Sequence, residues 1–120
     1  MDNPDGTGTL TISRMTIESD GVSFDFEGKV EGYGTVLASH TLSYIGEDRS
    51  RGRVRGEART FLEDNTLIST PHMGTFSRDG SSVTSYFTDA TNQGVVNFVI
   101  WDIDILTKAV AVRYWEVKSA

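Results

Sequence analysis

Alternation of apolar and polar residues between positions 22 and 31 is the feature that most constrains the fold. One parity is apolar or small and carries Val22, Phe24, Phe26, Gly28 and Val30, whereas the residues between them are polar or charged. Side chains alternate across a β-strand, so the pattern predicts a strand with one face in a core and the other in water. No window of useful length places apolar residues at helical spacing, which predicts little or no helix.

Similar short segments follow one another along the rest of the chain. They predict eight strands, over residues 9–18, 22–33, 35–45, 50–62, 66–77, 82–90, 94–103 and 108–117. The connections carry turn-forming residues such as Asp-Gly and Asn-Gln-Gly. Residues 1–6 have nothing apolar after Met1 and are predicted to form a flexible tail.

Eight short antiparallel strands without helices must bury one face, by closing into a barrel or by forming a sandwich. Short, hairpin-like connections favour the barrel, as do the small residues Gly52, Gly56 and Ala58 on the inward parity of segment 50–62. The chain of 120 residues is therefore predicted to be a single all-β domain, an eight-stranded up-and-down barrel of lipocalin-like form.

Composition and missing motifs limit the function classes. The 11 basic and 17 acidic residues give a net charge of −6, which argues against nonspecific nucleic-acid binding. The chain has no cysteine, no apolar run of the ~20 residues that a membrane helix needs, and no signal-peptide pattern, so a cytoplasmic protein without membrane contact is expected. The motifs of hydrolases, kinases and dehydrogenases are also missing, and no cofactor is expected.

Glycines at strand positions between residues 24 and 61 point to a family. The runs that carry the resemblance are FEGKVEGYG (26–34), YIGEDR (44–49) and GRVRG (52–56). This third of the chain resembles the first half of a bacterial family of small barrel proteins similar in fold to the allene oxide cyclases. A Gly-Thr-Gly segment expected in the second half is missing. The resemblance implies an eight-stranded barrel with an apolar lumen, and it transfers no catalytic residue to this sequence.

The two histidines are the first candidates for chemistry. His40 lies on the apolar parity of segment 35–45 and is predicted to point into the lumen, where it and Tyr44 could act as general acid or base. The alternative is a core histidine bonded to a backbone carbonyl. His72 follows Pro71, which disrupts sheet pairing, and is predicted to lie at the barrel mouth or on the surface. No HxH or HExxH spacing occurs, so no metal site is predicted.

Further candidates for binding a substrate lie in the last three segments. Asn97 lies among apolar residues of its parity and must find a hydrogen-bond partner in the barrel or in a ligand. Arg113 is the only charge on its parity; it either meets a buried anion, pairs with an acid such as Glu57 or Glu116, or lies at an oligomer interface. The large aromatic residues of these segments either line a pocket or fill the core; they are Tyr86, Trp101 and Trp115.

Two charged patterns have both a structural and a functional interpretation. Asp102 and Asp104 can run acid–base chemistry or bind a divalent ion, but such a pair more often ends a strand and starts a turn. Five arginines share one parity near segment 50–62: Arg49, Arg51, Arg53, Arg55 and Arg59. They form either an anion clamp or, the favoured interpretation, a solvated outer face. In the second case their partners are carboxylates on neighbouring strands, supplied by Asp25, Glu27 and Glu31.

Segments 94–103 and 108–117 are apolar on both faces, which predicts a homo-oligomer through residues 94–117. We expect the barrel to bind a small hydrophobic or amphipathic metabolite in its lumen and to promote isomerisation, cyclisation or a related acid–base step. Whether any reaction is catalysed stays open. One alternative is a carrier or sensor without chemistry. Another is an oligomeric interaction protein whose core is filled by Phe24, Phe26, Phe87 and Trp101.

Overall fold

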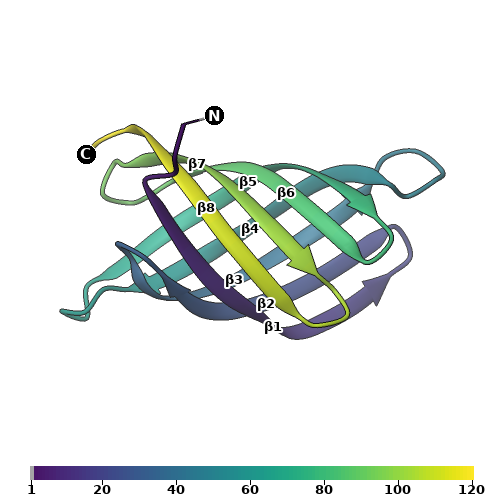
Figure 1. Ribbon diagram of the computed structural model, residues 1–120, viewed down its shortest axis with the longest axis horizontal. Coiled ribbons are helices and arrows are strands. Elements are labelled where there is room, and N and C mark those ends of the chain that lie inside the picture. The colour runs from purple at the N-terminus through teal and green to yellow at the C-terminus, as the bar shows by residue number, and fades with distance from the viewer. Residues whose placement is uncertain (1) are drawn as a thin grey trace.

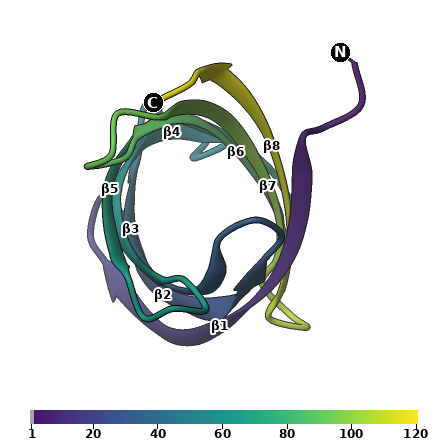
Figure 2. The same ribbon diagram turned by 90° about the vertical axis from the view of Figure 1, so that its left-hand side faces the viewer.

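The computed structural model describes residues 2–120 and forms a closed antiparallel barrel (Figures 1 and 2). Its strands are β1 (Gly6–Glu18), β2 (Gly21–Val30), β3 (Gly34–Tyr44), β4 (Arg51–Phe61), β5 (Leu67–Asp79), β6 (Ser82–Ala90), β7 (Val96–Asp104) and β8 (Ala109–Lys118). Consecutive strands pair with each other, and β1 closes the barrel by pairing with β8. The predicted fold class is confirmed, and residues 2–120 contain no helix.

The N-terminal segment is held more closely than the predicted tail. Gly6 already pairs with Tyr114 of β8, and the backbone N–H of Asp5 donates to the Tyr114 carbonyl at 2.9 Å. The Trp115 indole Nε1 donates to the Asp2 carbonyl at 2.9 Å. Met1, the first residue of the predicted tail, lies outside the described residues.

One end of the barrel, here called the mouth, is formed by the connections 31–33, 62–66 and 91–95. The first strand begins and the last strand ends toward the mouth, so both chain ends lie near this end of the barrel (Figure 1). Figure 2 looks onto the mouth and shows the β2–β3 connection folding inward across the opening. Gly32 and Gly34 flank Tyr33 with φ angles of +82° and +89°, a conformation that glycine adopts without steric cost. These two glycines let the connection turn inward.

Aromatic side chains fill the middle of the barrel. Phe24, Phe26, Phe87 and Trp101 are each at most 2% exposed. The ring of Trp101 meets the edges of Phe26 and Phe87 at centroid distances of 4.9 and 5.2 Å. The resemblance implies an apolar lumen; around Trp101 this interior is filled by packed aromatic rings.

The outward apolar residues of β7 are partly covered by the chain itself. Ile100 is only 6% exposed although it lies on the outer parity, opposite Arg113 of β8. The ring of Phe98 lies 6.1 Å from that of Trp115. Arg113 extends over Trp115 at 5.9 Å. A neighbouring subunit is thus not required to shield all of this face.

Candidate functional site

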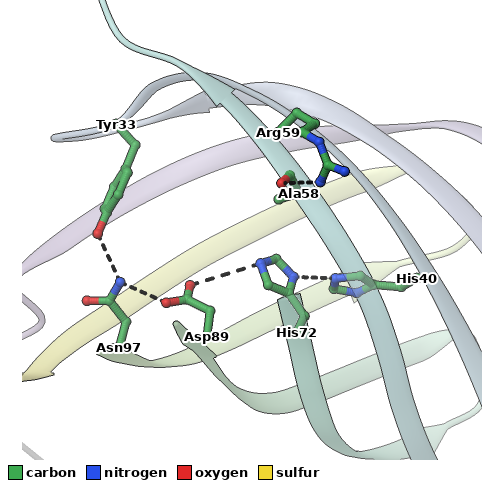
Figure 3. Close-up of polar contacts among 7 residues, drawn as sticks. All are labelled: Tyr33, His40, Ala58, Arg59, His72, Asp89 and Asn97. Carbon is green, nitrogen blue, oxygen red and sulfur yellow. Dashed lines mark hydrogen bonds and ion pairs between the residues drawn. The ribbon is translucent and has the colours of Figure 1, made fainter. Parts of the chain in front are cut away.

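Five connected polar side chains run from the centre of the barrel to its mouth (Figure 3). In spatial order they are His40 of β3, His72 of β5, Asp89 of β6, Asn97 of β7 and Tyr33 of the β2–β3 connection. We call this set the polar chain. It lies among apolar side chains, where each polar group needs a partner.

Strand register explains why four of these residues meet. Gly56 of β4 pairs with His40 on one side and with His72 on the other. His72 in turn pairs with Asp89, and Asp89 pairs with Asn97. A Cβ at Gly56 would lie 2.6 Å from Cδ2 of His40, so a side chain here would occupy the space of that ring. Because Gly56 has none, the two histidine rings touch across β4.

The two histidines form a buried pair. Nε2 of His40 lies 2.7 Å from Nδ1 of His72, so one ring donates and the other accepts. His40 stacks on Trp101 at 4.4 Å, and His72 stacks on Phe87 at 4.5 Å. His40 is therefore a core histidine, but its partner is another imidazole and not the backbone carbonyl considered from the sequence.

Asn97 holds the other half of the polar chain together. Its Nδ2 donates one hydrogen bond to Oδ1 of Asp89 and one to the hydroxyl of Tyr33, both at 2.9 Å. Oδ2 of Asp89 lies 4.0 Å from Nε2 of His72. The amide thus fixes one carboxylate oxygen and leaves the other facing the imidazole.

Burial moves the pKa values of this set in opposite directions. It lowers the pKa of His72 to about 3 and, together with the neighbouring His72, holds the pKa of His40 well below 6.5. It raises the pKa of Asp89 to about 6, although the hydrogen bond from Asn97 opposes this rise. At neutral pH both histidines are uncharged, and Asp89 is the member of the polar chain that titrates closest to neutrality.

The hydrogen bonds favour one tautomer when Asp89 is ionised. If His40 donates from Nε2 to His72, then Nε2 of His72 carries a proton and points it toward the carboxylate. Nδ1 of His40, which has no partner in the part of the chain described, is then a bare acceptor. Protonation of Asp89 allows the reverse order, with the carboxyl O–H directed at His72. The protonation state of the carboxyl and the order of the imidazole tautomers are therefore linked.

A small cavity lies between Asp89 and the mouth. It has a volume of about 50 Å³, and its polar wall includes His72, Asp89 and Asn97. Tyr33 and Tyr114 also line it; their rings meet edge to face at 5.4 Å, and the Tyr114 hydroxyl donates to the Glu31 carbonyl at 2.9 Å. Pockets for drug-sized ligands measure roughly 300–1,000 Å³. With Tyr33 in this position, only water or a very small molecule fits.

Asn97 presents one further hydrogen-bonding atom at this cavity. Its Oδ1 is buried and has no partner among the described residues. A buried acceptor left without a donor costs roughly 1–3 kcal/mol. The cavity thus combines a carboxyl, an amide with both donor and acceptor atoms, and hydroxyl groups of tyrosine and threonine on a wall that also carries apolar side chains.

Some of the residues expected from the sequence are brought together here. His40, His72 and Asn97 point inward into one set of contacts, and Trp101 packs against His40. Pro71 lies beside His72 at the point where pairing between β5 and β6 ends. The parity of His40 placed it correctly in the barrel interior. The prediction for His72, at the mouth or on the surface, is wrong: it is 4% exposed, because it shares the inward parity of Ile68 and Phe76 on β5.

The other expected residues lie elsewhere. Tyr44 is at the opposite end of the barrel, where its ring lies 6.2 Å from Phe76. Tyr86 is 40% exposed on the outer face. Arg113 and Trp115 also lie on the outer face, because Tyr114 faces the core and side chains alternate along β8. None of these four side chains lines the small cavity.

Arg113 and the Asp102–Asp104 pair have structural partners. Arg113 pairs with Asp102 at 3.1 Å, not with Glu57 or Glu116. Oδ1 of Asp104 accepts from the backbone N–H groups of Leu106 and Thr107, at 3.0 and 3.2 Å. The expectation that an aspartate here ends a strand and starts a turn is confirmed for Asp104.

Sequence reasoning missed Asp89 and Tyr33. Asp89 shares its parity with Val83 and Phe87, which was a visible signal that it faces the core. Tyr33 was included in a predicted strand over residues 22–33, but β2 ends at Val30. The inward turn of the connection, which brings Tyr33 to Asn97, has no counterpart in the strand pattern.

Residues 2–120 contain no group of three or more histidine, cysteine or acidic side chains arranged to hold a metal ion, nor a helix long and apolar enough to cross a membrane. Comparison with family models, with curated proteins and with solved structures found no match to this chain. The resemblance to barrels of the allene oxide cyclase type stays a prediction.

Proposed function

We propose that this barrel binds a small carbonyl compound of hydrophobic or amphipathic character at its mouth and catalyses an isomerisation by proton transfer. Asp89 would be the acid–base group, and Asn97 would hold the ligand oxygen. The observation that carries the proposal is the Asp89 carboxyl in the wall of the cavity, whose side chain is only 13% exposed; its pKa is raised to about 6, and the Asn97 amide orients it.

The hydroxyl of Tyr33 occupies the position proposed for the ligand oxygen. It accepts the second N–H of Asn97 at 2.9 Å. A carbonyl oxygen of the ligand would replace it, while Oδ1 of Asp89 keeps the first N–H. Since the cavity measures only about 50 Å³, a metabolite-sized ligand requires Tyr33 to move outward, and the glycines on both sides of Tyr33 permit such a movement.

The proposed reaction balances without a cofactor. Ionised Asp89 removes a proton from the carbon next to the carbonyl, and the electrons of the broken C–H bond form an enolate whose oxygen is held by Asn97. When the ligand carries a C=C bond one carbon further along, this enolate is conjugated. Protonated Asp89 then returns the proton to the far (γ) carbon of the dienolate, the double bond moves into conjugation with the carbonyl group, and the carbonyl re-forms. The hydrogen bond from Asn97 keeps the carboxylate oriented, and Nε2 of His72 lies 4.0 Å from its other oxygen.

The test is hydrogen exchange into the ligand. Cyclic and acyclic ketones, enones and aldehydes are incubated with the protein in D2O, and loss of the C–H signals is followed by ¹H NMR. The proposal predicts exchange for at least one compound with the wild type and none above background with Asp89→Asn. Asp102→Asn, which changes an outward carboxylate by the same substitution, is the matched control and should retain the exchange. Equal exchange with Asp89→Asn, or no exchange with any compound, would refute it.

A second candidate is a binding or interaction protein without chemistry. The filled middle of the barrel supports it, since Phe24, Phe26, Phe87 and Trp101 are packed together and the cavity beside them near the mouth measures only about 50 Å³. Tyr86 of β6 and Val117 of β8 are exposed apolar side chains on the outside of the barrel. They support self-association through the outer surface of these strands. Native mass spectrometry separates these candidates, because it reports bound small molecules and assembly state together. A monomer without ligand would argue against both the carrier and the oligomer.

A further inference from the structure

Three outward arginines on β4 lack the carboxylate partners expected for them. Arg51, Arg53 and Arg55, here called the arginine row, are exposed and occupy every second position of the strand. A strand advances about 3.3–3.4 Å per residue, so their side chains leave the sheet about 7 Å apart. Among the described residues, ion pairs with arginine involve only Arg59 and Arg113.

Strand register explains why the row is unpaired. Arg53 pairs with Ser43 of β3 and Thr75 of β5, and Arg55 pairs with Thr41 and Met73. These neighbours are hydroxyl or apolar residues. The acids of β2 that were expected to neutralise the row lie beyond β3, and Asp25 accepts a hydrogen bond from Ser39 at 2.8 Å.

Two other arginines, Arg59 on the outer parity of β4 and Arg78 at the end of β5, are satisfied by contacts within the chain. Arg59 pairs with Glu57 at 2.9 Å and donates to the Ala58 carbonyl at 3.2 Å, a contact shown in Figure 3. Arg78 donates to the carbonyls of Arg49 and Gly80 at 2.9 and 3.0 Å. The arginine row instead keeps three like charges side by side, and among the described residues no side chain forms an ion pair with any of them; Asp48, whose hydrogen bonds from Ser50 and the charge of Arg51 lower its pKa, is the acid near the end of the row. An anionic partner would relieve the mutual repulsion of the three arginines.

We propose that the arginine row is a docking surface for an acidic peptide segment in extended conformation, with carboxylates at every second position. Two extended chains have the same two-residue repeat of about 7 Å, so successive carboxylates fall opposite successive guanidinium groups. Guanidinium binds carboxylate through two parallel hydrogen bonds. The hydroxyls of Ser43 and Thr75, which flank Arg53, can bond the backbone of the segment.

Nucleic acid fits this surface less well than a peptide does. The net charge of −6 repels a long polyanion. The residues paired with Arg53 and Arg55 include no aromatic ring on which a base could stack. The spacing of the row and its hydroxyl neighbours match an extended peptide, and the segment needs only three carboxylates.

Fluorescence anisotropy at low ionic strength tests the proposal with two labelled heptapeptides of identical composition. In one, three glutamates alternate with threonines; in the other, the three glutamates are consecutive. The alternating peptide should bind more tightly, and its affinity should fall with added salt. Arg53→Gln should weaken it by about threefold to fivefold, the size of exposed charge pairs. Arg14→Gln on β1 causes the same change in net charge and should have less than a twofold effect.

Several results would overturn the proposal. Equal affinities for the two peptides, or no binding of either peptide, would show that the spacing of the carboxylates is not recognised. Equal loss of affinity in Arg14→Gln and Arg53→Gln would show that the row is not the binding surface. Tighter binding of a short oligothymidylate than of the alternating peptide would favour nucleic acid as the partner. Both substitutions are at exposed positions, where changes in stability are usually within about 0.5 kcal/mol, so folded protein should be obtained in each case.

Discussion

Asp89 and Asn97 act as a pair at the scale of single residues. Burial favours the neutral carboxyl, whereas the N–H of Asn97 favours the carboxylate, and the balance leaves the pKa of Asp89 at about 6. The same amide holds Tyr33 over the cavity. One side chain therefore both adjusts the acid–base group and closes the site.

Replacement of Asn97 by leucine should raise the pKa of Asp89 above about 6. The substitution keeps a side chain of similar size but removes the N–H that stabilises the carboxylate at 2.9 Å. ¹³C NMR of the Asp89 carboxyl carbon during a pH titration measures the change. Thr84→Val, which removes a hydrogen bond to the outward Asp102, is the control and should leave the pKa of Asp89 unaltered. An unchanged or lower value in Asn97→Leu would contradict this role for Asn97.

Parity within a strand reveals which residues share a face, and for His40 it was sufficient to place the side chain in the core. It does not reveal which inward residues meet, because that depends on the register between strands. His40 and His72 are 32 positions apart in sequence and touch only because both pair with Gly56. Asp89 could have been found from its parity, but its partner could not.

At the scale of elements, the absence of a side chain at Gly56 of β4 determines the geometry of the site. Gly56 leaves the gap in which the imidazoles of His40 and His72 approach to 2.7 Å. On the opposite face the same strand carries the arginine row. Alternate residues of β4 therefore shape the polar chain inside the barrel and form the arginine row on its outer face.

A methyl group at Gly56 should destabilise the barrel by about 1–3 kcal/mol, the usual cost of overpacking a core. Its Cβ would meet the His40 ring at 2.6 Å and the carbonyl oxygen of Ser39 at a still shorter distance. Urea denaturation of Gly56→Ala measures the loss of unfolding free energy. Gly80→Asn is the control, since its Cβ meets nothing within 4 Å and asparagine tolerates the φ of +61° there. A Gly56→Ala variant as stable as the wild type would show that the gap is not needed.

Strand positions were largely readable from the sequence, since each predicted segment overlaps one observed strand. The alternation of residues and the turn dipeptides carry this information. The inward faces of β7 and β8 were harder to assign, because both of their faces are apolar. Hence Arg113 and Trp115 were candidates for the lumen but lie outside.

At the scale of the whole molecule, the buried titratable groups determine how stability depends on pH. Between pH 3 and 6.5 an unfolded chain protonates His72, which the folded barrel keeps neutral, so acidification favours unfolding. The same direction holds for His40. Asp89 acts oppositely: between pH 3.8 and about 6 the folded barrel binds a proton that the unfolded chain does not.

The unfolding free energy should therefore rise with pH between about 4.5 and 5.5. The proton taken up by unfolded His72 is offset by the one held by folded Asp89, so the rise comes from the proton taken up by unfolded His40. Asp89→Asn removes the opposing contribution and should steepen the rise by about 1.4 kcal/mol per pH unit. Urea denaturation at a series of pH values measures both slopes. Parallel profiles for the wild type and Asp89→Asn would contradict burial of an ionisable Asp89.

The proposed proton transfer depends most directly on the acidity of one carboxyl group in the intact barrel. A pH titration of wild-type protein, followed by ¹³C NMR of the Asp89 carboxyl carbon, measures it. The buried position of Asp89 between His72 and Asn97 predicts a midpoint at about pH 6. A midpoint near 3.8, the ordinary value of an aspartate in water, would show that Asp89 is solvated and would remove the basis of the proposed proton transfer.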